Sequence, residues 1–554
     1  MLQDGLGGRK PTPLGIEFYE TVATDCYYVD KTGLLESIVT YPSGTCLLFT
    51  RPRRFGKTLM LSMLQSFFEK SSKDKSIYFQ DKKIWNNQDI VKQHFQKYPL
   101  IHINLKNVIG EGFSSLVYKL KETMRKEYAR HQDILSFLNE EERQFYSSVL
   151  NKNETQNGLP SSLARLTEFL AKSSKKKVIL LIDEYDTPVH YAYDYGFYDP
   201  TILFFKQFFG ESLKTNPNIQ LAVFTGILQI AKESLFSGLN NLVTNTVLSK
   251  NMDEGFGFTE EETKDIFKYY GIENQFEEVS SWYGGYRFGD KTIFNPLSVL
   301  SFIQNGGVLA PYWNNTGESK TLGSLLTPDS LSSIFPLLND EKTVAEVDLA
   351  ISYKDLNGSS SSLVSYLLAS GYFSIDNDYG DGFFSLKLPN KEIKYAFQKE
   401  IRSRYIDKEQ FPLVFQMRQA FEKGDVKLIQ TLVQDYLLST FSCFEMNKEI
   451  LISTMLSVIF DTSIVKNEVN AGSGRADIIV TPRNNKELAF VIEIKCLKTR
   501  TTKERLNQSA LSAISQIKEK GYSDELLRSN IKNILLFGMS FHQNKAAIQC
   551  EKVK

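Results

Sequence analysis

Short apolar runs alternate with longer amphipathic patterns over residues 12–250. Fully apolar runs such as Val178–Ile182 are typical of strands that are buried on both faces of a sheet. Strands that alternate with helices favour a parallel sheet covered by helices on both faces, which is an α/β fold. The strands are expected at 45–50, 100–105, 178–182 and 219–225, and the helices at 56–70, 114–130, 161–174 and 201–214.

The pattern changes after residue 250. Thr259–Glu262 has the sequence of a capping box and precedes an apolar-periodic stretch, which predicts the start of a more helical region. Asn357–Ser362 is rich in serine and is typical of a surface loop. Residues 363–460 are expected to be mostly helical, and the remainder of the chain returns to mixed strands and helices.

Composition and charge narrow the class of protein. Lys+Arg and Asp+Glu number 65 each, so any binding to nucleic acid must come from local patches. The five cysteines are dispersed and lack C-x-x-C spacing, which disfavours a disulfide framework or a zinc site. No apolar run has the length of a membrane span, and the first residues lack a secretory signal. We therefore expect a cytoplasmic protein without membrane contact, built from about two to four domains.

The segment Thr45–Thr58 carries the strongest chemical signal. An apolar run leads into a basic turn that ends in Gly56-Lys57-Thr58 and opens into an amphipathic helix, which is the layout of a phosphate-binding P-loop. Backbone N–H groups of the turn point at phosphate oxygens, Lys57 neutralises their charge, and the Thr58 hydroxyl can ligate Mg²⁺. Arg51 stands where the full pattern has glycine. The residues assigned to nucleotide binding in this segment are Arg54, Phe55, Gly56, Lys57, Thr58 and Leu59.

An acidic pair follows the apolar run 178–182. Asp183 and Glu184 stand where a nucleotide-hydrolysing sheet places its ligands for metal and water. Asp183 would hold Mg²⁺ directly or through water, and Glu184 would polarise the attacking water. Such a pair alone is often a helix cap, but the P-loop upstream favours the catalytic interpretation. Thr225, at the end of the run 219–225, would contact the γ-phosphate or the water, or simply ends a strand.

A second group of candidate catalytic residues lies near the C-terminus. Gly474–Val480 predicts a strand with Asp477 at its start, and Glu487–Lys495 predicts a second strand after a polar turn. Alternation with period two puts Glu493 and Lys495 on one face, and the hairpin brings that face beside Asp477. Asp477 and Glu493 can share a divalent metal while Lys495 positions water or stabilises charge on a phosphate, as metal-assisted phosphodiester hydrolysis requires.

The alternative interpretation is that these two strands form a hairpin at the edge of a sheet and carry ordinary solvent-exposed charges. We favour the site because Glu493 and Lys495 are embedded in an otherwise apolar strand, where unpaired charges are costly. The adjoining segment Lys495–Arg505 carries five basic residues and one acidic residue. Such a patch could hold a nucleic-acid backbone although the whole chain has no net charge.

Both groups, in this order, resemble a bacterial family that joins an N-terminal AAA-ATPase-like domain to a C-terminal PD-(D/E)XK nuclease-like domain. The resemblance covers most of the chain, and the basic P-loop is itself typical of the family, which accounts for Arg51 without a lost site. The motifs that carry it are Tyr28–Thr32, Arg51–Thr58, Leu181–Asp186, Thr225–Ser234, Phe236–Asn241, Trp282–Gly289, Gly474–Asp477, Glu493–Lys495 and Gln516–Tyr522.

The resemblance implies a P-loop domain at 12–250, a helical subdomain of the ATPase at 251–345, a helical connector at 346–430 and a restriction-endonuclease-like α/β domain at 431–554. The chain departs from the family's pattern at two positions. Gln229 replaces an expected arginine in the sensor-like segment, and Gly284 replaces an expected acidic or amide residue. A further nuclease carboxylate from the preceding helix is often present in the superfamily, and Glu449 and Glu468 are both candidates.

These features together predict an ATP-binding NTPase fused to a Mg²⁺-dependent nuclease that is regulated by, or coupled to, the nucleotide. Its expected substrate is DNA in preference to RNA, and its expected role lies in defence or mobile-element biology. One alternative is a nucleotide-dependent switch or scaffold whose C-terminal domain binds nucleic acid or protein without cleaving it. Another is a toxin or secreted effector. The sequence leaves open ATP against GTP, endonuclease against exonuclease, and whether the chain forms a homo-oligomer.

Overall fold

The computed structural model divides into two compact units, which are described separately. Unit 1 comprises residues 1–321 and 344–394, and unit 2 comprises residues 322–343 and 395–554. The finer division into four segments stays a prediction. The structure describes residues 8–154, 158–230, 235–236, 239–313, 325, 337, 342–357, 360–405, 411–440, 459, 464–471, 474–481, 488–497, 501–542 and 545–553.

The centre of unit 1 is a sheet of β1 (Thr45–Thr50), β2 (Leu100–Asn104), β3 (Val178–Asp183), β4 (Ile219–Gly226) and β5 (Leu242–Asn245). Its order is β2-β3-β4-β1-β5, and all neighbouring strands are parallel. Every residue of β1 and β3 is buried, as their apolar runs predict. The predicted α/β fold with its parallel sheet is confirmed. The short, half-buried β5 was not expected, because its sequence carries no clear pattern.

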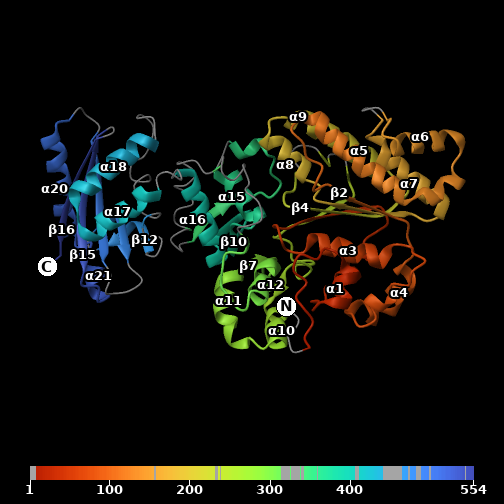
Figure 1. Ribbon diagram of the computed structural model, residues 1–554, viewed down its shortest axis with the longest axis horizontal. Coiled ribbons are helices and arrows are strands. Elements are labelled where there is room, and N and C mark those ends of the chain that lie inside the picture. The colour runs from red at the N-terminus through yellow and green to blue at the C-terminus, as the bar shows by residue number, and fades with distance from the viewer. Residues whose placement is uncertain are drawn as a thin grey trace. The chain divides into compact units, whose positions relative to one another are not determined.

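Helices cover both faces of this sheet (Figure 1). The helix after the P-loop lies on one face together with the first helix of the chain, and the long helices that follow β2 lie on the other. The helices are α1 (Tyr19–Asp25), α2 (Leu34–Ile38), α3 (Lys57–Phe68), α4 (Gln88–His94), α5 (Phe113–Arg130), α6 (Glu140–Leu150), α7 (Ser161–Ser174), α8 (Thr187–Asp194) and α9 (Tyr198–Leu213). All four expected helices of this region are present, with ends shifted by a few residues.

A small subdomain follows the sheet. Its strands are β6 (Phe258–Thr259), β7 (Tyr286–Phe288) and β8 (Lys291–Phe294), and its helices are α10 (Glu260–Tyr270), α11 (Phe276–Tyr283) and α12 (Pro296–Gln304). The strands form an antiparallel sheet in the order β6-β8-β7. The predicted capping box is present, since Thr259 accepts from the N–H of Glu262 while the Glu262 carboxylate accepts from the N–H of Thr259.

The region after residue 342 is less helical than expected. It contains α15 (Ser360–Ser370) and α16 (Lys391–Tyr405), together with a sheet of β9 (Thr343–Glu346), β10 (Ser374–Gly380) and β11 (Phe383–Lys387). The strand order is β10-β11-β9, and β10 pairs with β11 through two irregularities of register. The exposed, polar sequence of β10 and its bulges explain why no alternating pattern marked this hairpin.

Unit 2 contains a second five-stranded sheet in the order β12-β13-β14-β15-β16. Only β14 and β15 are parallel, and every other pair is antiparallel. The strands are β12 (Ile464–Ala471), β13 (Gly474–Thr481), β14 (Ala489–Cys496), β15 (Ile534–His542) and β16 (Lys545–Lys552). The helices are α17 (Phe411–Lys423), α18 (Val426–Thr440), α20 (Lys503–Lys520) and α21 (Asp524–Arg528).

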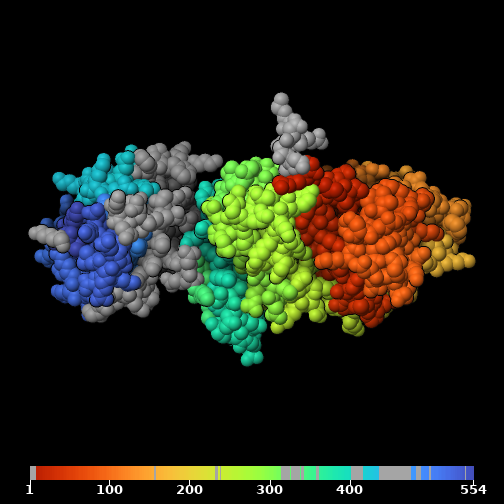
Figure 2. All heavy atoms as spheres, turned by 90° about the horizontal axis from the view of Figure 1, so that it is seen from below, coloured from red at the N-terminus to blue at the C-terminus, as the bar shows by residue number. Residues whose placement is uncertain are grey.

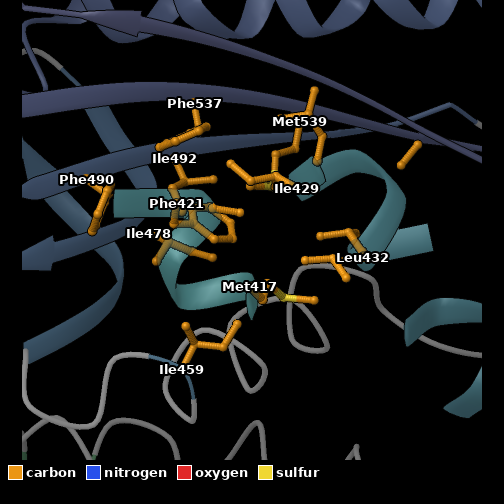
Figure 3. Close-up of a cluster of buried hydrophobic side chains, with 14 of the residues drawn as sticks. Met417, Phe421, Ile429, Leu432, Ile459, Ile478, Phe490, Ile492, Phe537 and Met539 are labelled. Atoms are coloured by element: carbon orange, nitrogen blue, oxygen red, sulfur yellow. The ribbon is translucent and has the colours of Figure 1, made fainter. Parts of the chain in front are cut away.

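A hydrophobic core joins α17 and α18 to this sheet (Figure 3). Phe421 of α17 packs against Phe490 of β14 and Phe537 of β15, with ring centroids 6.1 and 5.1 Å away. A second core lies around Ala476, Val491 and Ile517, where α20 covers the sheet. The central strands β13, β14 and β15 therefore bury apolar side chains on both faces, which leaves few positions for polar side chains within them. Within the part of the chain that the structure describes, no helix is long and apolar enough to cross a membrane.

Candidate nucleotide-binding and nuclease sites

The P-loop connects β1 to α3 through two residues in the left-handed region. Arg54 has φ +72° and Gly56 has φ +87°, so the loop curls and turns its N–H groups toward a common centre. Lys57 begins α3 and is 4% exposed. Its ammonium donates to the carbonyl oxygens of Arg51 and Pro52, each at 3.0 Å. Burial lowers the pKa of Lys57, while Glu184 acts against that shift.

Arg51 faces away from this centre and is fully buried. Its guanidinium donates to the carbonyl oxygens of Thr50 and Asn245 at 2.9 and 3.0 Å, and also to the Asn245 side chain. It lies over the rings of Phe256 and Phe288, 4.9 and 5.2 Å from their centroids. Burial lowers its pKa to about 9, which still leaves it charged at neutral pH. Arg51 thus anchors the P-loop to β5 and to the small subdomain.

Asp183 is held by polar side chains from three neighbouring elements. Thr58 of α3 donates to Oδ2 at 2.8 Å, Asn104 of β2 donates to Oδ2 at 2.9 Å, and Thr225 of β4 donates to Oδ1. Burial raises the pKa of Asp183, in spite of the hydrogen bond from Thr225. The Thr58 hydroxyl and the Asp183 carboxylate form an oxygen pair that fits Mg²⁺. Asn104 was missed, because nothing in the sequence says which strand lies beside β3.

Glu184 has a strained backbone, with φ +55° at a residue other than glycine. Its Oε2 accepts from the Thr187 hydroxyl at 2.9 Å. Burial alone would raise the pKa of Glu184, but Lys57, Thr187, Arg53 and Lys106 hold it below its ordinary value. Glu184 is therefore an ionised carboxylate beside the P-loop lysine, which suits a group that orients water.

The next two residues of the motif hold the segment after β4. Asp186 accepts from the N–H groups of Ile227 and Leu228 at 2.7 and 3.0 Å. The Tyr185 hydroxyl accepts from the N–H of Ile230 at 3.0 Å and donates to the carbonyl of Leu228. Burial raises the pKa of Asp186 to about 6. Gln229 therefore lies in a segment fixed on both sides, although it is not the arginine expected there.

A cavity of about 460 Å³ opens beside the P-loop. Lys57, Thr58 and Glu184 line its polar end, and Tyr27, Met63 and Leu300 are among the residues at its apolar end. The apolar end is built from the N-terminal segment, α3 and α12. Figure 2 shows the red N-terminal segment lying between the orange residues after the P-loop and the yellow-green subdomain. The volume and the two-ended lining fit a nucleotide with its base on the apolar side.

The N-terminal motif Tyr28–Thr32 has a structural role. Asp30 accepts from the backbone N–H groups of Thr32 and Lys83 at 2.8 and 2.7 Å. Lys31 donates to the carboxylate of Glu262 at 2.6 Å, which ties the motif to α10. Tyr28 and Lys31 also line the cavity.

The aromatic motif Trp282–Gly289 holds the residues just before α16. Asn390 donates to the carbonyl of Gly284 at 2.7 Å. A Cβ on Gly284 would lie 2.9 Å from the Phe294 ring, so the expected acidic or amide residue would not fit here without a shift of its neighbours. Gly285 has φ +80°, and a Cβ there would lie 2.1 Å from the carbonyl oxygen of Pro389.

Glu392, near the start of α16, is buried against α12. Ser298 donates to its Oε2 at 2.7 Å, and the N–H of Trp313 donates to its Oε1 at 2.8 Å. Burial raises the pKa of Glu392 to about 7. Pro296 and Leu300 of the same α12 line the nucleotide cavity. No motif drew attention to Glu392, because an isolated glutamate in an amphipathic stretch normally faces solvent.

In unit 2, β13 and β14 bring the predicted nuclease residues together. The register pairs Ile478 with Ile492, so the next positions, Asp477 and Glu493, face each other. Asp477 Oδ2 accepts from the N–H of Ile494 at 2.6 Å. Lys495 donates to Glu493 Oε1 at 2.9 Å, which places both side chains on one face as the alternation predicted. Asp477 lies within β13 and not at its start.

Gln516 of α20 completes the arrangement around Lys495. Its carbonyl oxygen accepts from Lys495 at 2.6 Å, and its amide donates to Glu493 Oε1. Glu493 is 3% exposed, and its Oε2 has no hydrogen-bond partner within the described ranges. A buried carboxylate oxygen left in this state fits a divalent cation shared with Asp477. The described residues contain no group of three or more His, Cys, Asp or Glu side chains arranged around one metal position.

The two candidates for a further carboxylate have different outcomes. Glu449 lies outside the described residues. Glu468 lies on β12, so the expectation that this carboxylate comes from a helix is wrong for Glu468. The register pairs Asn467 with Ile478 and Val469 with Ala476, which sets position 468 opposite Asp477. Of the basic patch, residues 498–500 lie outside the described ranges, and Lys503 and Arg505 begin α20.

Comparison with known proteins gives two matches to family models. One, described as a predicted AAA-ATPase, matches residues 13–236, and the other, described as the PD-(D/E)XK nuclease superfamily, matches residues 443–551. A protein of Azotobacter chroococcum mcd 1, called "Uncharacterized protein in vnfD 5'region", is 24% identical over 562 residues that cover 98% of each chain. The chain therefore carries an AAA-ATPase-like domain followed by a domain of the PD-(D/E)XK nuclease superfamily.

Proposed function

We propose that unit 1 binds ATP with Mg²⁺ and hydrolyses it. The observation that carries this proposal is that Lys57, Thr58 and Glu184 line one cavity, while the buried Asp183 accepts a hydrogen bond from Thr58. Lys57 would exchange its two backbone carbonyl partners for phosphate oxygens. Mg²⁺ held by Thr58 and Asp183 would neutralise charge on the phosphates. Glu184 would orient the attacking water, and Thr225 keeps Asp183 in place.

We propose that unit 2 cleaves a nucleic-acid backbone, and that DNA is its substrate. Asp477 and Glu493 would hold a divalent cation whose chemistry is the activation of water and the neutralisation of phosphate charge. Lys495, positioned by Gln516, would turn its ammonium to the scissile phosphate. The same hydrogen bonds also support a second candidate function. Because Lys495 is satisfied by Glu493 and Gln516 without any ligand, a domain that binds nucleic acid or protein without cleaving it is the alternative.

We further propose that nucleotide binding in unit 1 regulates cleavage in unit 2, in a cytoplasmic protein. This rests on the combination of the two domains in one chain. The test is cleavage of linear, circular and single-stranded DNA, and of RNA, with Mg²⁺ or Mn²⁺ and with or without ATP. Metal-dependent products establish the nuclease, and a requirement for ATP establishes the coupling. A wild-type protein that is inactive across this panel would favour the binding domain.

A further inference from the structure

The three arginines of the P-loop have different surroundings. Arg51 is fully buried and bonded to Thr50 and Asn245, and Arg54 is exposed. Arg53 and Arg54 both line the nucleotide cavity, but only Arg53 is half-buried. Among the described residues, Arg53 has no hydrogen-bond or ion-pair partner, so no structural role accounts for its guanidinium. An arginine that only stabilised the loop would be expected to have partners like those of Arg51.

Arg53 lies near the two groups on which the proposed hydrolysis depends most. Lys57 donates to the carbonyl oxygens of Arg51 and Pro52, the two residues that immediately precede Arg53. Glu184 lines the same cavity, and its pKa is lowered in part by the Arg53 guanidinium. Arg53 therefore lies close to both the ammonium that would hold phosphate oxygens and the carboxylate that would orient water.

The charge of Arg53 is not balanced by a carboxylate of its own. Lys57 is offset by Glu184, Asp186 and Asp183, which act against the larger effect of burial on its pKa. Lys106 pairs with Glu17 at 3.5 Å, and both residues line the cavity. The Arg53 guanidinium has no such ion pair within the described residues. A half-buried cation without a counterion is stabilised by an anionic ligand, and a triphosphate carries the required charge.

We propose that the Arg53 guanidinium binds the terminal phosphate of the nucleotide and stabilises the negative charge on it during hydrolysis. This inference rests on the proposed ATPase function. Water attacks the γ-phosphorus, and the bond from that phosphorus to the β–γ bridging oxygen breaks with its electron pair leaving on the diphosphate. The proton of the water passes to Glu184, and the products are nucleoside diphosphate and phosphate. Arg53 supplies the cation that Gln229 does not supply from the segment after β4.

The test compares Arg53→Ala, Arg53→Lys and wild type, with Arg125→Ala as the matched control. Arg125 is a half-buried arginine of α5 that pairs with Glu122 away from the cavity. Affinities for ADP and for a non-hydrolysable ATP analogue are measured by calorimetry, and turnover by phosphate release. We expect Arg53→Ala to keep ADP affinity within about threefold, to lose about tenfold or more in affinity for the analogue, and to lose about 10²-fold or more in turnover.

We expect Arg53→Lys to recover affinity for the analogue better than turnover, because an ammonium keeps the charge without the two-pronged geometry. If Arg53→Ala matches wild type both in turnover and in its preference for the triphosphate analogue over ADP, the assignment of Arg53 is overturned. The proposed ATPase function would remain intact in that case. A wild-type protein that binds neither nucleotide would overturn the ATPase proposal and this inference together. Unchanged thermal unfolding of both Arg53 variants excludes misfolding as the cause.

Discussion

Thr58 on α3 donates a hydrogen bond of 2.8 Å to Oδ2 of Asp183 on β3, which joins two motifs that are 125 positions apart in the chain. The contact depends on strand order. The P-loop strand β1 and the acidic strand β3 are separated by β4 alone, so α3 passes over the end of β3. The phosphate-binding and water-orienting residues consequently meet at the same edge of the sheet. The predictions for unit 1 depend on this relationship.

Lys57→Ala should abolish or strongly weaken nucleotide binding. The buried ammonium lies on the carbonyl oxygens of Arg51 and Pro52 and is the proposed partner of the phosphate, so an alanine would leave the phosphate charge uncompensated. A hydrogen bond to a charged group contributes about 1.5–3 kcal/mol, so affinity should fall by about tenfold or more. Calorimetric titration checks this, with Lys172→Ala as a surface control that loses only its pairing with Glu142. Equal affinity of wild type and Lys57→Ala would refute the P-loop assignment.

Glu184→Gln should separate binding from hydrolysis. A glutamine keeps the size and the hydrogen bond with Thr187 but cannot accept a proton. We expect nucleotide affinity to persist and turnover to fall by about 10²-fold or more. Lys57 and other neighbours hold the pKa of Glu184 below its ordinary value. Wild-type hydrolysis should therefore also persist on acidification to pH values below the usual pKa of a glutamate. Phosphate release against pH measures both effects, and unchanged turnover in Glu184→Gln would make this residue a structural cap.

Much of unit 1 could be predicted from its sequence, because buried parallel strands leave unambiguous apolar runs. Four of the five strands of its main sheet and all four expected helices lie close to the predicted residues. The hairpin β10–β11 was not predicted, since β10 is mostly exposed and β11 is a short run with three consecutive buried residues, so neither strand shows alternation. Local sequence patterns predict the buried residues of regular helices and strands. They do not predict an element that is short, polar or interrupted by a bulge.

Only those residues of the candidate sites that belong to a short continuous motif could be predicted from the sequence. The motifs Gly56-Lys57-Thr58 and Glu493–Lys495 can be recognised in the sequence from the spacing of their residues. Asn104 and Gln516 act through neighbours on other elements, and no linear pattern shows those neighbours. The sequence shows Arg51 only as the residue that replaces the P-loop glycine, as is typical of the resembled family, and its anchoring role depends on Asn245, nearly two hundred residues away.

Glu392→Gln should change how the stability of unit 1 depends on pH. Burial raises the pKa of the folded carboxyl from 4.5 to about 7. At a pH below 4.5 the carboxyl is neutral in both folded and unfolded chains and costs nothing. Between pH 4.5 and about 7 the unfolded chain ionises this carboxyl while the folded chain keeps it neutral, so the free energy of unfolding falls by a few kcal/mol over this range and levels off above it.

The glutamine removes this pH-dependent cost and can keep both hydrogen bonds, because its oxygen accepts from Trp313 and its amide can donate to the Ser298 hydroxyl. The free energy of unfolding of Glu392→Gln, relative to that of wild type, should therefore be higher at pH 8 than at pH 5. Thermal unfolding at both values measures the difference, with the exposed Glu211→Gln as control. A difference between variant and wild type that does not change with pH would contradict a neutral Glu392.

Asp477→Ala and Lys495→Ala should both lose metal-dependent cleavage, for different reasons. Asp477→Ala removes a ligand of the cation and also the acceptor for the N–H of Ile494, at a stability cost of about 1 kcal/mol. Lys495→Ala removes the ammonium beside the scissile phosphate and leaves both carboxylates, so it should still bind Mn²⁺. Cleavage assays with Mn²⁺ titration separate the two, and Asp435→Ala and Lys518→Ala on α18 and α20 serve as matched controls.

Cleavage that survives in Asp477→Ala would falsify the nuclease site itself, and cleavage that survives in Lys495→Ala would leave that lysine a purely structural partner of Glu493 and Gln516. The same assay decides whether the two units are coupled. If wild-type protein cuts only with ATP present, Lys57→Ala should be inactive as a nuclease while its Mn²⁺ affinity at Asp477 and Glu493 stays unchanged. If Lys57→Ala cuts as well as wild type, the nuclease works independently of the nucleotide, and the regulatory part of the proposal is wrong.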